Sequence, residues 1–285
     1  MNIKKLLVYS TIIGSMNIAF AQSAWTKKEK EIYTQVSFND ISNYSSVFNK
    51  NGEDFKPSRV ITDQTLQFYG EYGLTDKLTL TASIPFKLLK TGDLVNNSTF
   101  PATIEEGSFN ALGNIRLSSR YKLSDKKINI AAQIDLDLPT SSFDEATGLR
   151  SGFDATTILP TIAVGKGFKN FYVQSFGGVF FRTNDYSNGL KFYAEGGYKF
   201  FNRLWVAAFI DIVDSFEDGD AVPESTNLET FLYFNDSEYS GFGYKIIGEI
   251  TDSFGVTAAM AGAFSANLEA KKASYNVGLY YKINN

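Results

Sequence analysis

The sequence has no cysteine and no histidine among its 285 residues. Without cysteine, the chain can form no disulfide, carry no lipid on an N-terminal cysteine and build no Cys/His metal site. Without histidine, it lacks the side chain that ordinarily titrates between about pH 5 and 8, so acid/base catalysis would depend on carboxylates or lysine. We therefore expect a protein that is not an enzyme and that binds no cofactor.

The chain also has little net charge and no long apolar run beyond its N-terminus. Lys and Arg total 27 against 31 Asp and Glu, and charges of both signs are interspersed along the sequence. This pattern provides no basic surface for nucleic acid, so we expect no nucleic-acid partner. After the N-terminal run, no stretch approaches the roughly 18 consecutive apolar residues that a transmembrane helix needs.

The first residues have the pattern of a secretory signal peptide. Lys4 and Lys5 precede an apolar run, and Ala19-Phe20-Ala21 supplies the small-x-small sequence that signal peptidase cleaves. We predict a cleaved signal peptide over residues 1–21 and a mature barrel over residues 22–285. The alternative is an uncleaved anchor helix, which is disfavoured by polar residues within the run: Ser10, Thr11, Ser15 and Asn17.

The sequence is rich in aromatic residues and has a period of two. Aromatic residues make up 15% of the chain, yet the mean hydropathy is only −0.14. Apolar and polar residues alternate between Ile128 and Leu138, and again between Leu112 and Leu123. Alternation places apolar side chains on one face of a strand and polar side chains on the other. In an exported chain, this is typical of a barrel with a lipid-facing surface and a polar lumen.

Twelve segments follow this pattern, an even number as bacterial barrels require. Short turns alternate strictly with longer connections rich in Asn, Asp, Ser, Gly and Glu. We predict an all-β fold: a single closed antiparallel transmembrane β-barrel of about twelve strands, with short periplasmic turns and long extracellular loops. A soluble β-sandwich or lipocalin-like barrel is the alternative, but soluble strands average only about 5–6 residues. The expected strands cover 31–39, 63–74, 78–87, 109–123, 127–139, 155–165, 171–182, 189–200, 203–213, 239–250, 254–264 and 273–283.

The parity of these strands also predicts which charged side chains point into the lumen. If Leu123 faces Ile128 across a tight turn, Arg116 lies opposite Asp135 and Asn114 opposite Asp137, which makes a ladder of polar and ionic pairs. The inward charges either line a path for polar or amphipathic solutes, or neutralise one another in a narrow, filled lumen. The candidate lumen-lining residues are Glu71, Arg116, Arg120, Asp135, Asp137, Glu195, Lys199, Asp211, Lys245 and Glu249.

Aromatic residues bear on the kind of solute. Inward-facing aromatic residues would make the lumen partly apolar and suited to a hydrophobic or aromatic solute; the candidates are Phe176, Phe180, Trp205 and Phe209.

Carboxylates also cluster in the connection that begins after residue 213. Their spacing does not match an EF-hand, so we interpret them as a solvated acidic loop and predict no metal site. They include Glu217, Asp218 and Asp220.

Several stretches resemble a known family. Ser23-Ala24-Trp25-Thr26 lies near the expected mature start, the run 69–80 reads YGEYGLTDKLTL and precedes Ile84-Pro85-Phe86, and the run 112–117 reads LGNIRL. These features resemble the outer-membrane barrel family named after the meta-pathway of phenol degradation, although Asn114 stands where that family usually has Asp. The resemblance implies an uptake barrel for hydrophobic compounds and supplies no catalytic residue. The chain is too short for the N-terminal plug of the long-chain fatty acid transporters.

These observations predict a bacterial outer-membrane barrel that conducts or takes up small, hydrophobic or aromatic molecules. The alternative is a non-conducting structural or adhesion-type barrel that acts through its extracellular loops. The expected partners are outer-membrane lipid, an unidentified small-molecule solute and the barrel insertion machinery. Such barrels often end on an aromatic residue, whereas here Tyr280 and Tyr281 are followed by four further residues. We expect this aromatic pair to serve as the insertion signal instead.

Overall fold

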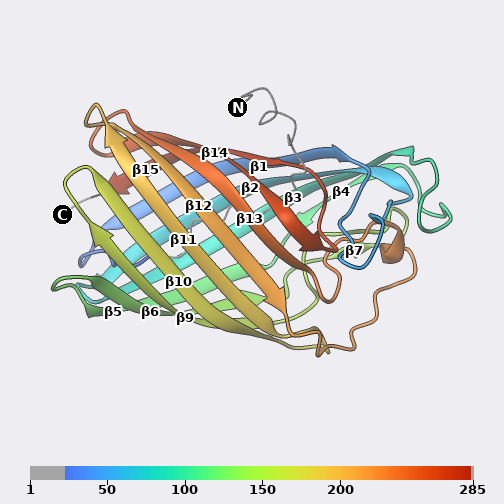
Figure 1. Cartoon of the computed structure of the whole chain (residues 1–285), viewed down its shortest axis with the longest axis horizontal. Coiled ribbons are helices and arrows are strands. Elements are labelled where there is room, and N and C mark those ends of the chain that lie inside the picture. Colours follow the sequence, from blue (N-terminus) through green and yellow to red (C-terminus); the bar gives the residue numbers. More distant parts are fainter. Residues whose placement is uncertain (1–22, 284–285) are drawn as a thin grey trace, which may run out of the picture.

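The computed structural model describes residues 23–283 and shows a closed β-barrel whose strands run obliquely to its long axis (Figure 1). The predicted signal peptide lies outside the described residues. Within them, no helix is long and apolar enough to cross a membrane, and a single 3-10 turn, η2 (Asn227–Glu229), stands in a long connection. The wall is built from β1 (Ile32–Tyr44), β2 (Arg59–Thr75), β3 (Leu78–Leu94), β4 (Gly107–Leu112), β5 (Ile115–Ser124), β6 (Asn129–Leu138), β9 (Thr157–Gly167), β10 (Phe171–Arg182), β11 (Gly189–Phe200), β12 (Leu204–Ser215), β13 (Glu238–Glu249), β14 (Phe254–Asn267) and β15 (Ser274–Ile283).

The ring closes because β1 pairs antiparallel with both β2 and β15. Ile32 lies opposite Tyr72 on one side and opposite Ile283 on the other. All other neighbours in the ring are also antiparallel, and β4 and β5 both pair with β3. Closure pairs the strands around the ring, which avoids a cost of several kcal/mol for each backbone group left unpaired in hydrocarbon. The short β4, toward the loop end, is paired with β3 alone. The predicted closed barrel of twelve strands is confirmed.

One predicted strand, 109–123, is interrupted at Gly113 and Asn114. On β3, Phe86 pairs with Leu112 and Ser83 with Arg116, so one extra residue is accommodated at the break, as in a β-bulge. Pro85 faces this break and has no amide hydrogen to donate. The Gly113 carbonyl instead accepts from the Thr140 hydroxyl at 2.6 Å. We therefore count β4 and β5 as one interrupted strand of the wall.

The outer surface is apolar and the interior is polar, the reverse of a soluble sheet protein. In β9 the side chains alternate strictly, with Ile158 and Ile162 exposed and Thr157 and Thr161 buried. The same arrangement recurs around the ring, where exposed side chains include Phe68, Leu117, Ile134, Val173 and Val277. A belt of this kind suits contact with lipid tails, as the period of two predicts.

The register predicted between β5 and β6 is wrong by two residues. Arg116 lies opposite Asp137, not Asp135, which instead lies opposite Ser118. The cause is the turn: a register irregularity follows Lys122, and Ser124 pairs with Ile130. A displacement of two residues leaves every side chain on its original face, so alternation predicts orientation without fixing the cross-strand partner.

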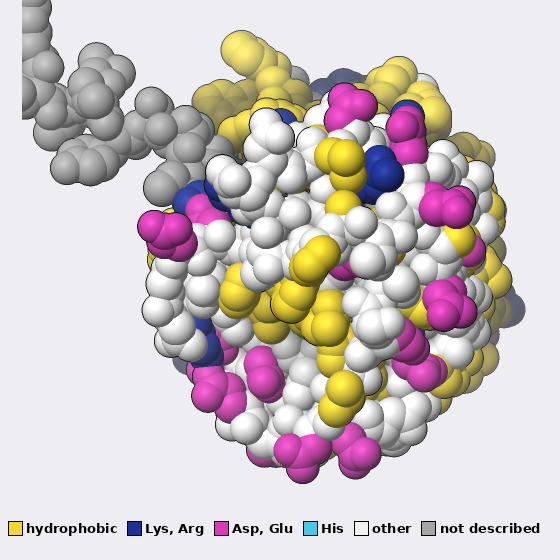
Figure 2. Space-filling model, turned by 90° about the vertical axis from the view of Figure 1, so that its right-hand side faces the viewer, with side chains coloured by type: hydrophobic (Ala, Val, Ile, Leu, Met, Phe, Trp, Pro, Cys, Tyr) yellow, Lys and Arg dark blue, Asp and Glu magenta, His cyan; other side chains and the backbone are white. Residues whose placement is uncertain are grey.

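The two ends of the barrel differ. At the short-turn end, on the left of Figure 1, β2 and β3 are joined through Asp76 and Lys77 only. At the loop end, β2 and β3 extend well beyond their predicted limits, and Arg59 still pairs with Leu94. The connection after β6 forms its own small hairpin from β7 (Phe143–Asp144) and β8 (Leu149–Arg150). The face in Figure 2 belongs to the loop end, where apolar side chains lie near the centre and acidic side chains lie around them.

Candidate functional site: two cavities inside the barrel

The loop end is closed by a lid that comes mainly from the connection between β12 and β13. In this connection, Phe231 and Tyr233 adopt positive φ angles of 59° and 56°. Left-handed backbone at such residues costs about 1 kcal/mol or more each, so packing must offset it. Phe231 stacks on Phe55 with ring centroids 5.0 Å apart and lies 5.8 Å from Phe100. The buried cluster that forms this lid contains Ile41, Tyr44, Val47, Ile61, Leu89, Leu149, Phe231, Leu232, Phe234 and Ala270.

Polar contacts fix the lid to neighbouring loops. The Glu229 carboxylate accepts hydrogen bonds from the backbone N–H groups of Thr103 at 3.0 Å and Ile104 at 3.4 Å. Burial raises the pKa of Glu229, but these hydrogen bonds outweigh it and hold the pKa below its ordinary value. The Thr230 hydroxyl donates to the Gly148 carbonyl at 2.8 Å. The Ser58 N–H also donates to the Glu229 carbonyl at 3.0 Å, so the lid is hydrogen-bonded to three other loops.

Beneath the lid lies the first cavity, which we call the loop-end cavity, with a volume of about 310 Å³. Three ion pairs stand in its wall: Lys87 with Asp63 at 2.5 Å, Arg116 with Asp137 at 2.5 Å, and Lys191 with Asp211 at 2.9 Å. The wall is also aromatic, with Phe176, Phe180, Tyr193, Tyr233 and Tyr239 among its residues.

A second cavity, the turn-end cavity, has a volume of about 430 Å³ and lies toward the short-turn end. Its wall includes Lys245 and Glu195, whose charged atoms lie 2.5 Å apart, and Trp205. Glu249, also in this wall, pairs with Lys199 at 3.2 Å. Most charges in this wall are therefore matched within the protein, while Lys282, also in the wall, forms no ion pair among the described residues.

The N-terminal segment, residues 23–31, enters the barrel: residues 23–27 lie inside, beside this cavity, whereas residues 28–30 are exposed at the short-turn end. The sequence analysis did not predict this arrangement. Ala24 is buried, and the Lys27 amide donates to the Thr79 hydroxyl at 2.8 Å. A Cβ at Gly165 would stand 2.7 Å from the Ala24 Cβ and 2.9 Å from the Trp25 ring, so this wall position needs glycine for the close approach. A short inserted segment thus occupies part of the lumen beside the turn-end cavity.

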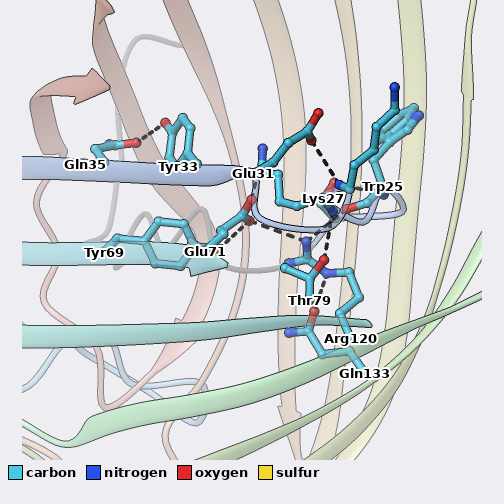
Figure 3. Close-up of polar contacts among 12 residues, drawn as sticks. Trp25, Lys27, Glu31, Tyr33, Gln35, Tyr69, Glu71, Thr79, Arg120 and Gln133 are labelled. Carbon is cyan, nitrogen blue, oxygen red and sulfur yellow. Dashed lines mark hydrogen bonds and ion pairs between the residues drawn. The ribbon is translucent and has the colours of Figure 1, made fainter. Parts of the chain in front are cut away.

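Arg120 connects this segment to the wall (Figure 3). Its side chain is fully buried and donates to the Trp25 carbonyl at 3.0 Å and to Gln133 at 2.7 Å. Glu71 lies 3.4 Å from Arg120 and 3.2 Å from Lys27. One arginine therefore holds together β5, β6, β2 and the inserted segment.

A stack of aromatic rings separates the two cavities. Phe176 and Tyr193 are 5.1 Å apart and nearly parallel, and Tyr193 and Phe209 are 5.6 Å apart. Phe176 and Tyr193 line both cavities, so the stack stands where the two meet. On β6, which β9 separates from β10, Gln133 donates to Asp135 at 2.6 Å. The lumen thus contains two small cavities in series, separated by an aromatic partition.

The structure distributes the ten candidate lumen residues along this axis. Arg116, Asp137 and Asp211 line the loop-end cavity; Glu71, Glu195, Lys245 and Glu249 line the turn-end cavity. Arg120 and Asp135 are buried in the wall, and Lys199 reaches the lumen through its pair with Glu249. The sequence analysis missed the lid, although four consecutive apolar residues at 231–234, in a loop otherwise rich in polar residues, were a signal for it.

Comparison with known proteins shows similarity at the level of the fold. No protein-family model and no curated sequence matches the chain. Among solved structures, an outer-membrane channel from Pseudomonas putida F1 is similar with a TM-score of 0.68 and 15% identity, over 91% of this chain and 98% of that one. The NanC porin is similar with a TM-score of 0.51 and 8% identity, over 88% of this chain and 100% of that one. The KdgM porin has a TM-score of 0.51 and 7% identity, over 88% of this chain and 99% of that one.

Proposed function

We propose that this protein is a passive channel of a bacterial outer membrane for small, largely apolar molecules, and that the structure represents its occluded state. The observation that carries the proposal is the pair of cavities in series inside a closed barrel. A barrel with a purely structural role could fill its lumen with side chains, as small barrels do. This lumen instead keeps two spaces of ligand size, the larger about 430 Å³.

The chemistry of the walls supports a small amphipathic solute. Aromatic rings supply apolar contact in both cavities, and the ion pairs there compensate one another. One of the structurally similar porins, KdgM, has been crystallised with an oligogalacturonate. A polyanionic saccharide calls for a path lined with uncompensated cations. Walls in which most charges are paired, together with stacked rings, fit a compact organic molecule better.

The proposal includes that the protein lies in the outer membrane and that it is not an enzyme. The apolar belt and the closed ring fit a lipid bilayer, and the predicted signal peptide at residues 1–21 would direct the chain across the inner membrane. Without histidine, the lumen carboxylates are left to their lysine and arginine partners, which supports a channel and not an enzyme. The alternative, a non-conducting barrel acting through its loops, is favoured by no specific contact in the lid.

The test is influx into vesicles with lipopolysaccharide in the outer leaflet, which slows direct crossing by apolar solutes. Vesicles with and without the refolded barrel are compared for entry of 2-phenylethanol and of a disaccharide. We expect the barrel to accelerate entry of the aromatic alcohol and to exclude the disaccharide. Equal rates with and without the barrel for both solutes would contradict the proposal and favour the structural alternative.

A further inference from the structure

One basic side chain in the wall of the loop-end cavity has no carboxylate partner among the residues that the structure describes. Its wall has four basic side chains, and three of them pair with carboxylates at 2.9 Å or less. The fourth, Arg182, has no carboxylate oxygen within 4.0 Å among the described residues, and its buried Nε has no hydrogen-bond partner. Burying an unpaired charge lowers the stability of the folded protein, so an unpaired, partly buried guanidinium is a candidate for a functional group.

Two phenyl rings hold the Arg182 side chain in place at the end of β10. The guanidinium carbon lies 4.0 Å from the centroid of the Phe153 ring and 4.4 Å from that of Phe180. Contacts with ring faces satisfy a guanidinium only electrostatically, because its N–H donors lie in its own plane and stay free. Those in-plane donors match the two oxygens of a carboxylate. The side chain is therefore oriented without being hydrogen-bonded.

The remaining unpaired charge in the wall is Glu269, which follows β14. Burial, with a further contribution from Asp63, raises the pKa of Glu269 to about 8, although Arg182, Lys87 and Lys191 act to lower it. At neutral pH this carboxyl is largely protonated. The three ion pairs cancel, and Arg182 then gives the loop-end cavity one net positive charge.

We propose that the loop-end cavity is a binding site for a small organic monoanion, whose carboxylate pairs with Arg182 and whose apolar body lies against Phe176, Phe180 and Tyr233. The inference rests on the proposed function, because it names the class of solute that the cavity retains. The volume of about 310 Å³ is at the lower end of ligand pockets, roughly 300–1,000 Å³. It suits a molecule with one ring or a short chain and excludes an oligosaccharide.

The experiment is titration calorimetry of the full refolded barrel in detergent, with benzoate as the probe and benzamide as its uncharged counterpart. The variants are Arg182→Gln, which removes the unpaired charge, and Arg182→Lys, which keeps it. The matched control is Lys191→Gln, which removes the same amount of charge from the same wall at a paired position. Heat-modifiable migration on gels checks that each variant forms a barrel.

We expect benzoate to bind the wild-type barrel more tightly than benzamide does. Arg182→Gln should weaken benzoate binding roughly tenfold to a hundredfold, the range for charge-assisted hydrogen bonds, and leave benzamide unchanged. Arg182→Lys should restore part of the affinity, and Lys191→Gln should weaken benzoate less than Arg182→Gln does. Equal affinity for the two probes, or equal loss in the two Gln variants, would overturn the site.

The outcomes separate this inference from the proposed function. Influx of 2-phenylethanol through a barrel that does not distinguish benzoate from benzamide would refute the anion site and leave the channel standing. Selective benzoate binding by a barrel that conducts nothing would refute the channel and leave the site as that of a receptor.

Discussion

Replacing Arg120 by Met should release the N-terminal segment from the lumen. The guanidinium contributes one charged hydrogen bond to the docking of that segment, at 3.0 Å to the Trp25 carbonyl, while its contacts with Gln133 and Glu71 lie within the wall. A hydrogen bond to a charged group contributes about 1.5–3 kcal/mol. Its loss should raise the fraction of undocked chains roughly 10- to 150-fold, at about 1.4 kcal/mol for each factor of ten.

Limited trypsinolysis after Lys27, followed by mass spectrometry, measures this fraction. When opening and closing are fast relative to cleavage, the cleavage rate follows the population of the open form. Lys27 is suited to the assay because its amide bonds to Thr79 when the segment is docked. The rate should rise by the same 10- to 150-fold in Arg120→Met.

The control is Arg203→Met, because Arg203 is half exposed and pairs with the exposed Asp252 at the short-turn end. That variant should cleave at the wild-type rate. If Arg120→Met also cleaves at the wild-type rate while still forming a barrel, the Trp25 bond does not hold the segment, and the reasoning is refuted.

Three further predictions follow from the packing and ion pairs. Gly165→Leu should also speed trypsin cleavage after Lys27, because its Cβ would clash with Ala24, whereas Gly167→Leu, with nothing within 4 Å of its Cβ, should not; equal rates would contradict the close approach. Lys87→Met leaves Asp63 buried without its cation and should lower the free energy of unfolding, measured in denaturant, by about 3–5 kcal/mol. Lys122→Met, which breaks the more exposed pair with Asp125, should lower it by less than about 1 kcal/mol. Similar losses in the two variants would count against burial as the cause. Because the pKa of Glu229 is held below its ordinary value, its contribution to the stability of the lid is complete above about pH 5 and is lost as pH falls through the lowered pKa. In this acidic range the protease sensitivity of the lid should rise in the wild type, but it should not change with pH in Glu229→Gln.

The strands were predictable because a membrane barrel imposes a period of two over many residues. Segments such as 157–166 alternate between inward and outward positions, so sequence alone indicates their faces. Register is a weaker signal, since a displacement of two residues changes no face. The turn after β5 shows this: it moved Arg116 from the predicted Asp135 to Asp137 and kept both residues inside.

The occluding parts of the lumen could not be predicted from periodicity, because they have none. Residues 23–31 form no strand before β1 and are placed by single contacts, such as Lys27 with Thr79. The lid depends on two left-handed residues, Phe231 and Tyr233, and on partners in four other loops. Arg182 shows the same limit: the sequence analysis did not single it out, and its lack of a carboxylate partner among the described residues appears only when the neighbouring strands and loops are in place.

The most direct test of the central claim is single-channel conductance in planar bilayers. It compares the wild-type barrel with Phe176→Ala and Phe209→Ala, which shorten the aromatic partition, and with Phe181→Ala, whose side chain points outward. The two inward variants should conduct measurably more than wild type, and Phe181→Ala should match wild type. If all four barrels are silent, or if the outward variant conducts as much as the inward ones, the two cavities are not parts of one path through the lumen.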